Sequence, residues 1–133
     1  MFDNPMKCLK TLNGHEHSVS FLVFSPDGNN LYSASRDKTI KLWEVNSGFC
    51  KSTFKGHDEW VRSLSINNKG DMIASCSDDE TVIVWSDKGE LKNQFKCHEN
   101  VIEHVLFVND ENSKKEIYYG EFNSHGEDKL QEI

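Results

Sequence analysis

The chain has 133 residues, of which 36% are hydrophobic and 28% are charged. This length suits one ordinary domain of about 100–150 residues. The net charge of −7 argues against non-specific binding to nucleic acid, and no apolar run is long enough to cross a bilayer. The start of the chain also lacks the pattern of a secretory signal peptide. We therefore expect a cytosolic or nuclear protein with no nucleic-acid partner and no membrane insertion.

Short β-like runs alternate with turn signals along the first two thirds of the chain, which predicts an all-β fold. One such turn is Ser25-Pro26-Asp27-Gly28, where proline presets φ and glycine accepts a positive φ. The predicted strands, in chain order, cover residues 8–12, 19–24, 31–35, 39–45, 49–54, 61–66, 72–77, 81–85, 91–95 and 101–107.

Four cysteines are spread along these runs without a C-x-x-C pair. In a chain with no secretory signal, this spacing favours reduced thiols. We interpret them as small buried packing residues. They are Cys8, Cys50, Cys76 and Cys97.

The predicted strands belong to a repeat with a period of 42 residues, which is typical of β-propeller blades. The positions that carry the repeat are Gly14, His15, Asp37 and Trp43, followed by Gly56, His57, Asp79 and Trp85. A closed propeller needs at least about four blades, so this chain is too short to form one. We expect a partial β-propeller with two complete four-stranded blades and flanking strands of incomplete blades.

The repeat also predicts how the chain is divided. Residues 1–14 would carry the outer strand of a preceding incomplete blade, and residues 15–55 and 56–96 would be the two complete blades. Residues 97–108 would begin a third repeat, with Cys97 in the glycine position. Residues 109–133 are polar and acidic, so we expect a disordered tail, with residues 117–122 as one candidate strand.

Each repeat also carries histidine, serine and aspartate, the residue types of a hydrolase triad. A catalytic triad needs one exposed nucleophile beside an oxyanion hole. Here the set occurs once per blade, which favours a structural network and predicts no enzyme and no catalytic residue. The residues of the two predicted networks are His15, Ser33, Ser35, Asp37 and Trp43, and His57, Ser75, Ser77, Asp79 and Trp85.

We expect a hydrogen-bond relay in each blade that runs from aspartate through histidine and serine to the tryptophan indole. A buried indole needs an acceptor and a buried carboxylate needs donors. The sequence leaves open which of the two strand serines takes part. The pair His15-x-His17 could suggest a metal site, but Glu59 replaces the second histidine in the next repeat, so we expect no metal and no other cofactor.

The G-H … D … W pattern over residues 8–107 resembles that of WD-repeat propellers. The runs SASRDKTIKLWEV (33–45), TFKGHDEWVR (53–62) and IASCSDDETVIVW (73–85) are similar to central repeats of the lissencephaly protein family, also called the nuclear distribution factor family. That resemblance implies a non-catalytic regulatory subunit of platelet-activating factor acetylhydrolase and a regulator of cytoplasmic dynein. It also implies a role in nuclear migration, the mitotic spindle and cell division, at the microtubule cytoskeleton and its organising centre.

The partners implied by the resemblance are the dynein motor domain, nuclear distribution cofactors and acetylhydrolase catalytic subunits. It assigns partner binding to Arg36, Trp60 and Arg62 on one face of the propeller. The repeat itself does not require these residues, because Asp78 replaces Arg36 and Ser18 replaces Trp60 at the equivalent positions. Arginine and tryptophan are enriched at interface hot spots, although a loop arginine is often only a solvated charge.

A second reading is a generic WD-repeat adaptor, such as a ubiquitin-ligase substrate receptor or a signalling scaffold. The dimerisation helix and coiled coil that the lissencephaly family carries are not found in this chain. We expect a fragment, whether a truncated protein or an incomplete gene product. Two blades leave unpaired faces and strand edges, which favour association.

Overall fold

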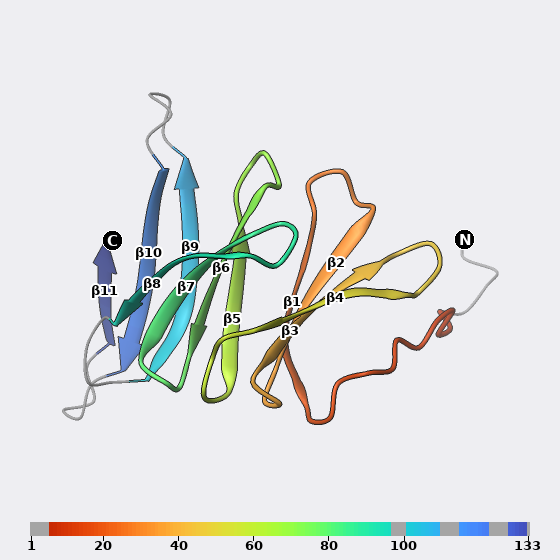
Figure 1. Cartoon of the computed structure of the whole chain (residues 1–133), viewed down its shortest axis with the longest axis horizontal. Helices are drawn as coiled ribbons and strands as arrows, with labels where there is room; N and C mark the ends of the chain where they lie inside the picture. Colours follow the sequence, from red (N-terminus) through yellow and green to blue (C-terminus); the bar gives the residue numbers. More distant parts are fainter. Residues whose placement is uncertain (1–5, 97–100, 110–114, 123–127, 133) are drawn as a thin grey trace.

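The computed structural model describes residues 6–96, 101–109, 115–122 and 128–132, and β-strand is the only regular secondary structure in these ranges. Figure 1 shows the strands in order along the chain. They are β1 (Val19–Phe24), β2 (Asn30–Ser35), β3 (Thr39–Glu44), β4 (Cys50–Lys55), β5 (Val61–Ile66), β6 (Met72–Ser77), β7 (Thr81–Ser86), β8 (Leu91–Lys96), β9 (Ile102–Asn109), β10 (Lys115–Phe122) and β11 (Asp128–Glu132). The all-β prediction is confirmed. No helix among these residues is long and apolar enough to span a membrane.

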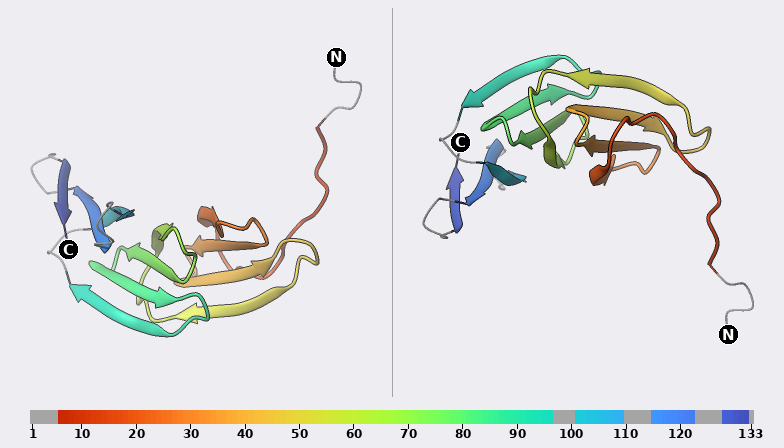
Figure 2. Two further views of the ribbon diagram at one scale, coloured as in Figure 1. Left: turned by 90° about the horizontal axis from the view of Figure 1, so that it is seen from above. Right: turned by 90° about the horizontal axis from the view of Figure 1, so that it is seen from below.

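The strands form three antiparallel sheets in which neighbours in the chain are neighbours in the sheet. The first sheet has the order β1-β2-β3-β4, the second β5-β6-β7-β8 and the third β11-β10-β9. Figure 2 shows the sheets following one another along an arc, with β1, β5 and β9 on its inner side and β4 and β8 on its outer side. The expected partial propeller with two complete four-stranded blades is therefore confirmed.

The middle sheet explains why the alternation of apolar and polar residues is weak in the sequence. All residues of β7 from Thr81 to Trp85 are buried, as are those of β6 from Ile73 to Ser77. A sheet covered on both faces needs apolar or hydrogen-bonded side chains on both. The strands at the margins, β1 and β8, are mostly exposed by contrast.

Two apolar clusters lie at the junctions between the sheets. The first joins the first and second sheets through Tyr32, Ala34, Ile40, Leu42, Phe54, Val61, Leu64, Ile73, Ile83 and Trp85. The second joins the second and third sheets through Ala74, Cys76, Val82, Val84, Ile102, Val105, Phe107, Ile117 and Tyr119. The core is thus divided into one layer per junction, as expected for stacked blades.

The corners that follow β2 and β6 have three residues each and the same backbone form. Lys38 has a φ of 77° and Glu80 a φ of 71°, and both stand in the last position of the corner. A type I turn followed by a left-handed residue is a common three-residue hairpin connection. The corner places the preceding aspartate, Asp37 or Asp79, at the end of the two central strands of its sheet, where the relay begins.

The pairing of the first two strands has a one-residue irregularity at the same place in every sheet. It falls between Val19 and Phe21 in β1, between Val61 and Ser63 in β5, and opposite the step from His104 to Ile102 in β9. The residues skipped by the ladder are Ser20, Arg62 and Glu103. A bulge of this kind takes one side chain out of the strict alternation of the strand.

The prediction of a disordered tail after residue 108 is wrong for the part that the structure describes. Strands β10 and β11 form a sheet with β9, and Ile117 and Tyr119 are buried in the second apolar cluster. Average polarity misled the prediction, because a strand needs only alternate apolar residues to cover one face. The candidate strand at residues 117–122 is part of β10, and β11 begins at Asp128.

Two smaller expectations also differ from the structure. Residues 8–12, predicted as an outer strand, form no strand, since no other described segment pairs with them. Cys8 and Cys50 are exposed, and only Cys76 among the described cysteines is buried. Cys8 and Cys50 are equivalent positions of the repeat, but both lie in solvent, so equivalence did not imply burial. Cys97, in the predicted glycine position, lies outside the described residues.

Candidate functional site

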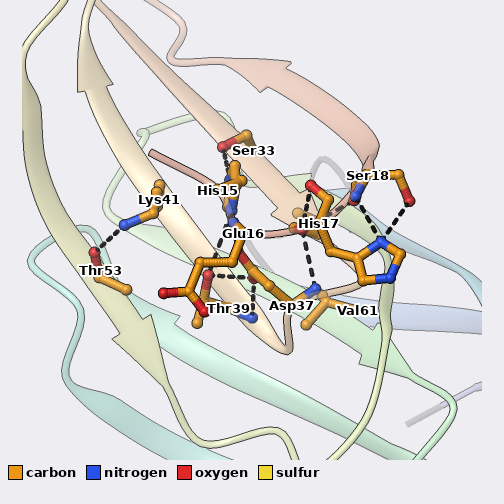
Figure 3. Close-up of polar contacts among 12 residues, drawn as sticks. His15, Glu16, His17, Ser18, Ser33, Asp37, Thr39, Lys41, Thr53 and Val61 are labelled. Atoms are coloured by element: carbon orange, nitrogen blue, oxygen red, sulfur yellow. Dashed lines mark hydrogen bonds and ion pairs between the residues drawn. The ribbon is translucent and has the colours of Figure 1, made fainter. Parts of the chain in front are cut away.

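The first blade contains a continuous hydrogen-bond relay from its corner to its tryptophan, and Figure 3 shows the part formed by Asp37, His15 and Ser33. The Nδ1–H of His15 donates to Asp37 Oδ2 at 2.8 Å, and Nε2 of His15 lies 2.6 Å from Ser33 Oγ. Nε1–H of Trp43 donates to the same serine oxygen at 2.8 Å. Because the carboxylate can only accept, the histidine carries its proton on Nδ1 and accepts from the serine at Nε2.

The second blade repeats the relay with almost the same distances. His57 lies 2.8 Å from Asp79 Oδ2 and 2.7 Å from Ser75 Oγ, and Nε1–H of Trp85 donates to Ser75 Oγ at 2.8 Å. Both relay serines are buried, at 2% exposure for Ser33 and 0% for Ser75. The relays therefore present no accessible hydroxyl nucleophile to a substrate.

The other two strand serines hold the corners instead of the relays. Ser35 Oγ donates to the carbonyl of Ser18 at 2.9 Å and accepts from the backbone N–H of Asp37 at 3.0 Å. Ser77 Oγ likewise accepts from the N–H of Asp79 at 3.1 Å. The choice that the sequence left open is thus made by position: Ser33 and Ser75 bond to tryptophan, and Ser35 and Ser77 fix the turn.

The relay aspartates are held in their charged form by many donors. Burial acts to raise the pKa of Asp37, but hydrogen bonds from Thr39, His15 and the N–H of Glu16 outweigh it and lower the pKa to about 2. The pKa of Asp79 is lowered in the same way, against burial, by His57 and Thr81. Both carboxylates therefore bind protons more weakly in the folded chain than in the unfolded chain.

We predict that the protein loses stability in acid because of these two groups. A folded pKa below the ordinary value of 3.8 means that the stabilisation is complete above about pH 5 and falls as the pH drops toward 2. Urea unfolding at pH 6, 4 and 3 should give a falling free energy of unfolding. In Asp37→Asn and Asp79→Asn variants the slope should be smaller, and an unchanged slope would contradict the assignment.

A second group of residues lies where the two blades meet. The guanidinium carbon of Arg62 lies 4.1 Å from the centre of the Trp60 ring, and that of Arg36 lies 5.2 Å from it. Arg36 comes from the corner after β2, whereas Trp60 and Arg62 come from the start of the second blade. The structure therefore brings together all three residues predicted to bind a partner, as two cations stacked against one indole.

The two arginines differ in their ionic partners. Arg62 donates from Nε and Nη2 to the carboxylate of Asp78, a bidentate ion pair, and this hydrogen bonding raises the pKa of Arg62. Arg36 is exposed, and its guanidinium makes no ion pair within the described part of the chain. Arg36 thus leaves its donors directed to solvent, while Arg62 is fixed in place.

The sequence analysis missed Asp78 as a member of this group. The signal was a reversal of charge, since Asp78 is the repeat equivalent of Arg36 in two blades that otherwise match closely. The bulge at Arg62 frees that side chain from the ladder, and the backbone N–H of Asp78 donates to the carbonyl of Trp60 at 3.0 Å. Corner and strand are therefore joined at both backbone and side chain.

Neither relay nor stack offers an evident place for a metal. Within residues 6–96, 101–109, 115–122 and 128–132, no group of three or more His, Cys, Asp or Glu side chains is arranged to hold an ion. A hollow of about 420 Å³ lies next to Asp37, lined mostly by the first blade, and its lining includes Lys38, Lys41 and Lys55.

Comparison with known proteins agrees with this architecture. The family model described as "WD domain, G-beta repeat" matches residues 6–44 and 48–86. The nuclear distribution protein PAC1 of Candida tropicalis is 51% identical over 51 residues, which cover 38% of this chain and 10% of the relative. The nuclear distribution protein nudF 1 of Talaromyces marneffei is 54% identical over 50 residues, covering 35% of this chain and 11% of the relative.

The match among solved structures extends further along the chain. The structure of U3-55K gives a TM-score of 0.77 at 21% identity and covers 93% of this chain and 41% of the matched chain. At that identity the likeness concerns the fold alone. The chain thus spans less than half the length of the structure it matches, and its matched segments cover about a tenth of the curated relatives.

Proposed function

The chain belongs to the WD40 repeat family, and we propose that it is a non-enzymatic protein-interaction scaffold that acts in dynein regulation. Its similarity to nuclear distribution proteins supports this role. The proposed setting is the cytoplasm, at microtubules and their organising centre, in nuclear migration and cell division. The proposed partners are the dynein motor domain, nuclear distribution cofactors and acetylhydrolase catalytic subunits, and the proposed scaffold units are residues 15–55 and 56–96.

One observation carries the proposal: the Arg36–Trp60–Arg62 stack, which neither relay requires. Trp60 is half-buried and lies against two guanidinium groups, and Arg62 is held in place by its ion pair with Asp78. A rigid aromatic platform under an arginine with free donors is a typical interface anchor, because little side-chain freedom is lost on binding. Such a surface would bind a carboxylate-rich patch on a protein partner.

We predict that Arg36→Ala weakens binding to a purified dynein motor domain by about tenfold or more. Arginine is enriched among interface hot spots, whose truncation to alanine costs about 2 kcal/mol or more. Biolayer interferometry with the immobilised chain would measure it. Arg62→Ala should also weaken binding, since it removes the second guanidinium group that lies against Trp60.

The matched control is Lys69→Ala, in the turn between β5 and β6. It removes the same charge from an exposed residue on a connection that does not contribute to the stack. Equal affinity of the wild type, Arg36→Ala and Arg62→Ala would exclude this face. An equal loss of affinity in Arg36→Ala, Arg62→Ala and Lys69→Ala would instead indicate a general effect of charge.

A further inference from the structure

Figure 2 shows the two ends of the arc. At each end, large apolar side chains of the sheet are exposed and no described residue covers them. On the first sheet, Val19, Leu22 and Phe24 of β1 are 48%, 57% and 58% exposed. An apolar patch of large side chains on a sheet face is unusual for a monomer and marks a contact surface. We call these three residues the leading face.

The repeat shows what normally covers the leading face. The residues 42 positions later, Val61 and Leu64, are 0% and 2% exposed, and Ile66 packs against the same apolar cluster. In the third sheet, Ile102, Val105 and Phe107 of β9 occupy the same role and are buried. In the second and third sheets, the surface equivalent to the leading face is therefore covered by the preceding sheet.

The other end of the arc has the complementary surface. Leu106 on β9 is 57% exposed, and together with His104, Val108, Tyr118 and Gly120 it lines an open concavity of about 460 Å³. We call this lining the trailing face.

The repeat also identifies what covers a trailing face. β10 pairs with β9 as β6 pairs with β5, so Tyr118 and Gly120 stand where Ala74 and Cys76 stand in the second sheet. There, these positions are buried under the next sheet. In the second sheet, which is followed by another sheet, the surface equivalent to the trailing face is therefore covered.

We infer that two copies of the chain associate head to tail, with the leading face of each packed against the trailing face of the other. Both halves of the contact are present on one chain, and each repeats a junction already found inside it. The described residues of two copies supply six sheets, which lies within the four to eight blades of known propellers. A head-to-tail contact that closes gives a finite ring, here a dimer. This inference goes beyond the proposed function.

Sedimentation velocity of the whole chain tests the inference. It is best run at high ionic strength, so that repulsion between two chains of charge −7 is screened. The expected mass is twice the 15.3 kDa of one chain. Leu22→Glu on the leading face and Leu106→Glu on the trailing face should each yield monomers, because a closed dimer of either variant places a charge in both contacts.

A mixture of the two variants gives the decisive result. A Leu22→Glu chain retains its trailing face and a Leu106→Glu chain retains its leading face, so an equal mixture should regain a dimer through one intact contact. Phe49→Glu is the matched control, since Phe49 is 74% exposed in the β3–β4 turn and belongs to neither face. This variant should remain dimeric.

Three outcomes would overturn the inference. A wild type that stays monomeric at a concentration on the order of 100 μM would exclude the contact between copies. A mixture that stays monomeric would exclude the head-to-tail arrangement, and a ladder of species larger than a dimer would exclude closure. Circular dichroism of each variant separates these results from unfolding, because all substituted side chains are exposed in the single chain.

Discussion

Replacing Asp79 by alanine is expected to lower the free energy of unfolding by about 3–5 kcal/mol, because it breaks a buried hydrogen-bond network and leaves several donors without their acceptor. Its carboxylate accepts from His57 Nδ1 at 2.8 Å, from the N–H of Asp58 at 3.0 Å, and from the N–H and hydroxyl of Thr81 at 3.0 and 2.5 Å. Alanine leaves all four donors without this acceptor. The imidazole then loses the bond that orients it toward Ser75.

The loss is large compared with the 5–15 kcal/mol of a typical domain. Urea unfolding followed by tryptophan fluorescence would measure it, and hydrogen exchange at β5–β8 would locate it. The matched control is Asp58→Ala, one carboxylate removed from an exposed residue beside the relay. A change below about 1 kcal/mol for Asp79→Ala would show that the relay is not a main support of the blade.

Gly89→Ala is expected to destabilise the fold by about 2–4 kcal/mol, because it combines backbone strain with overpacking. Gly89 has a φ of 91° in the β7–β8 turn, a conformation that alanine rarely adopts. A Cβ at this position would lie 2.7 Å from two ring carbons of Phe54. That ring is fully buried against Trp85, at 5.5 Å between ring centres, and has little room to move.

Gly28→Ala separates the two contributions. Gly28 has a similar φ of 77°, but a Cβ there meets nothing within 4 Å. Its cost should be only the backbone strain, about 1 kcal/mol. Thermal unfolding of both variants gives the difference, and equal losses for the two would mean that the contact between Gly89 and Phe54 contributes nothing.

Much of this fold could be predicted from the sequence because the two complete blades share the same pattern of strand and turn residues. The predicted strands at residues 19–24, 61–66 and 72–77 have the bounds observed for β1, β5 and β6. Turn residues end each strand at a definite position, and the 42-residue period fixes the order of the strands. One repeat thus served as an internal check on the other.

The parts that could not be predicted depend on contacts between segments. The burial of Ile117 and Tyr119 follows from the second sheet lying beside them, a fact that tail composition does not contain. Ser33 and Ser35 lie on the same face of β2, so the choice between them follows from position along the strand: Ser33 lies within reach of Trp43, whereas Ser35 lies at the corner. For the candidate site, the family resemblance pointed to Arg36 and Trp60, but their stacking across two blades depends on the packing of the sheets.

The recurrent bulge near the start of each sheet has a consequence for how such a protein can diversify. Its three occupants are Ser20, Arg62 and Glu103, one neutral, one positive and one negative. Since this side chain stands outside the ladder, exchanging it changes the charge of the rim and spares the apolar layers beneath. Each added blade therefore brings one more bulge position at which a substitution can change the charge of the binding surface. The binding preference can change in this way while the fold is kept.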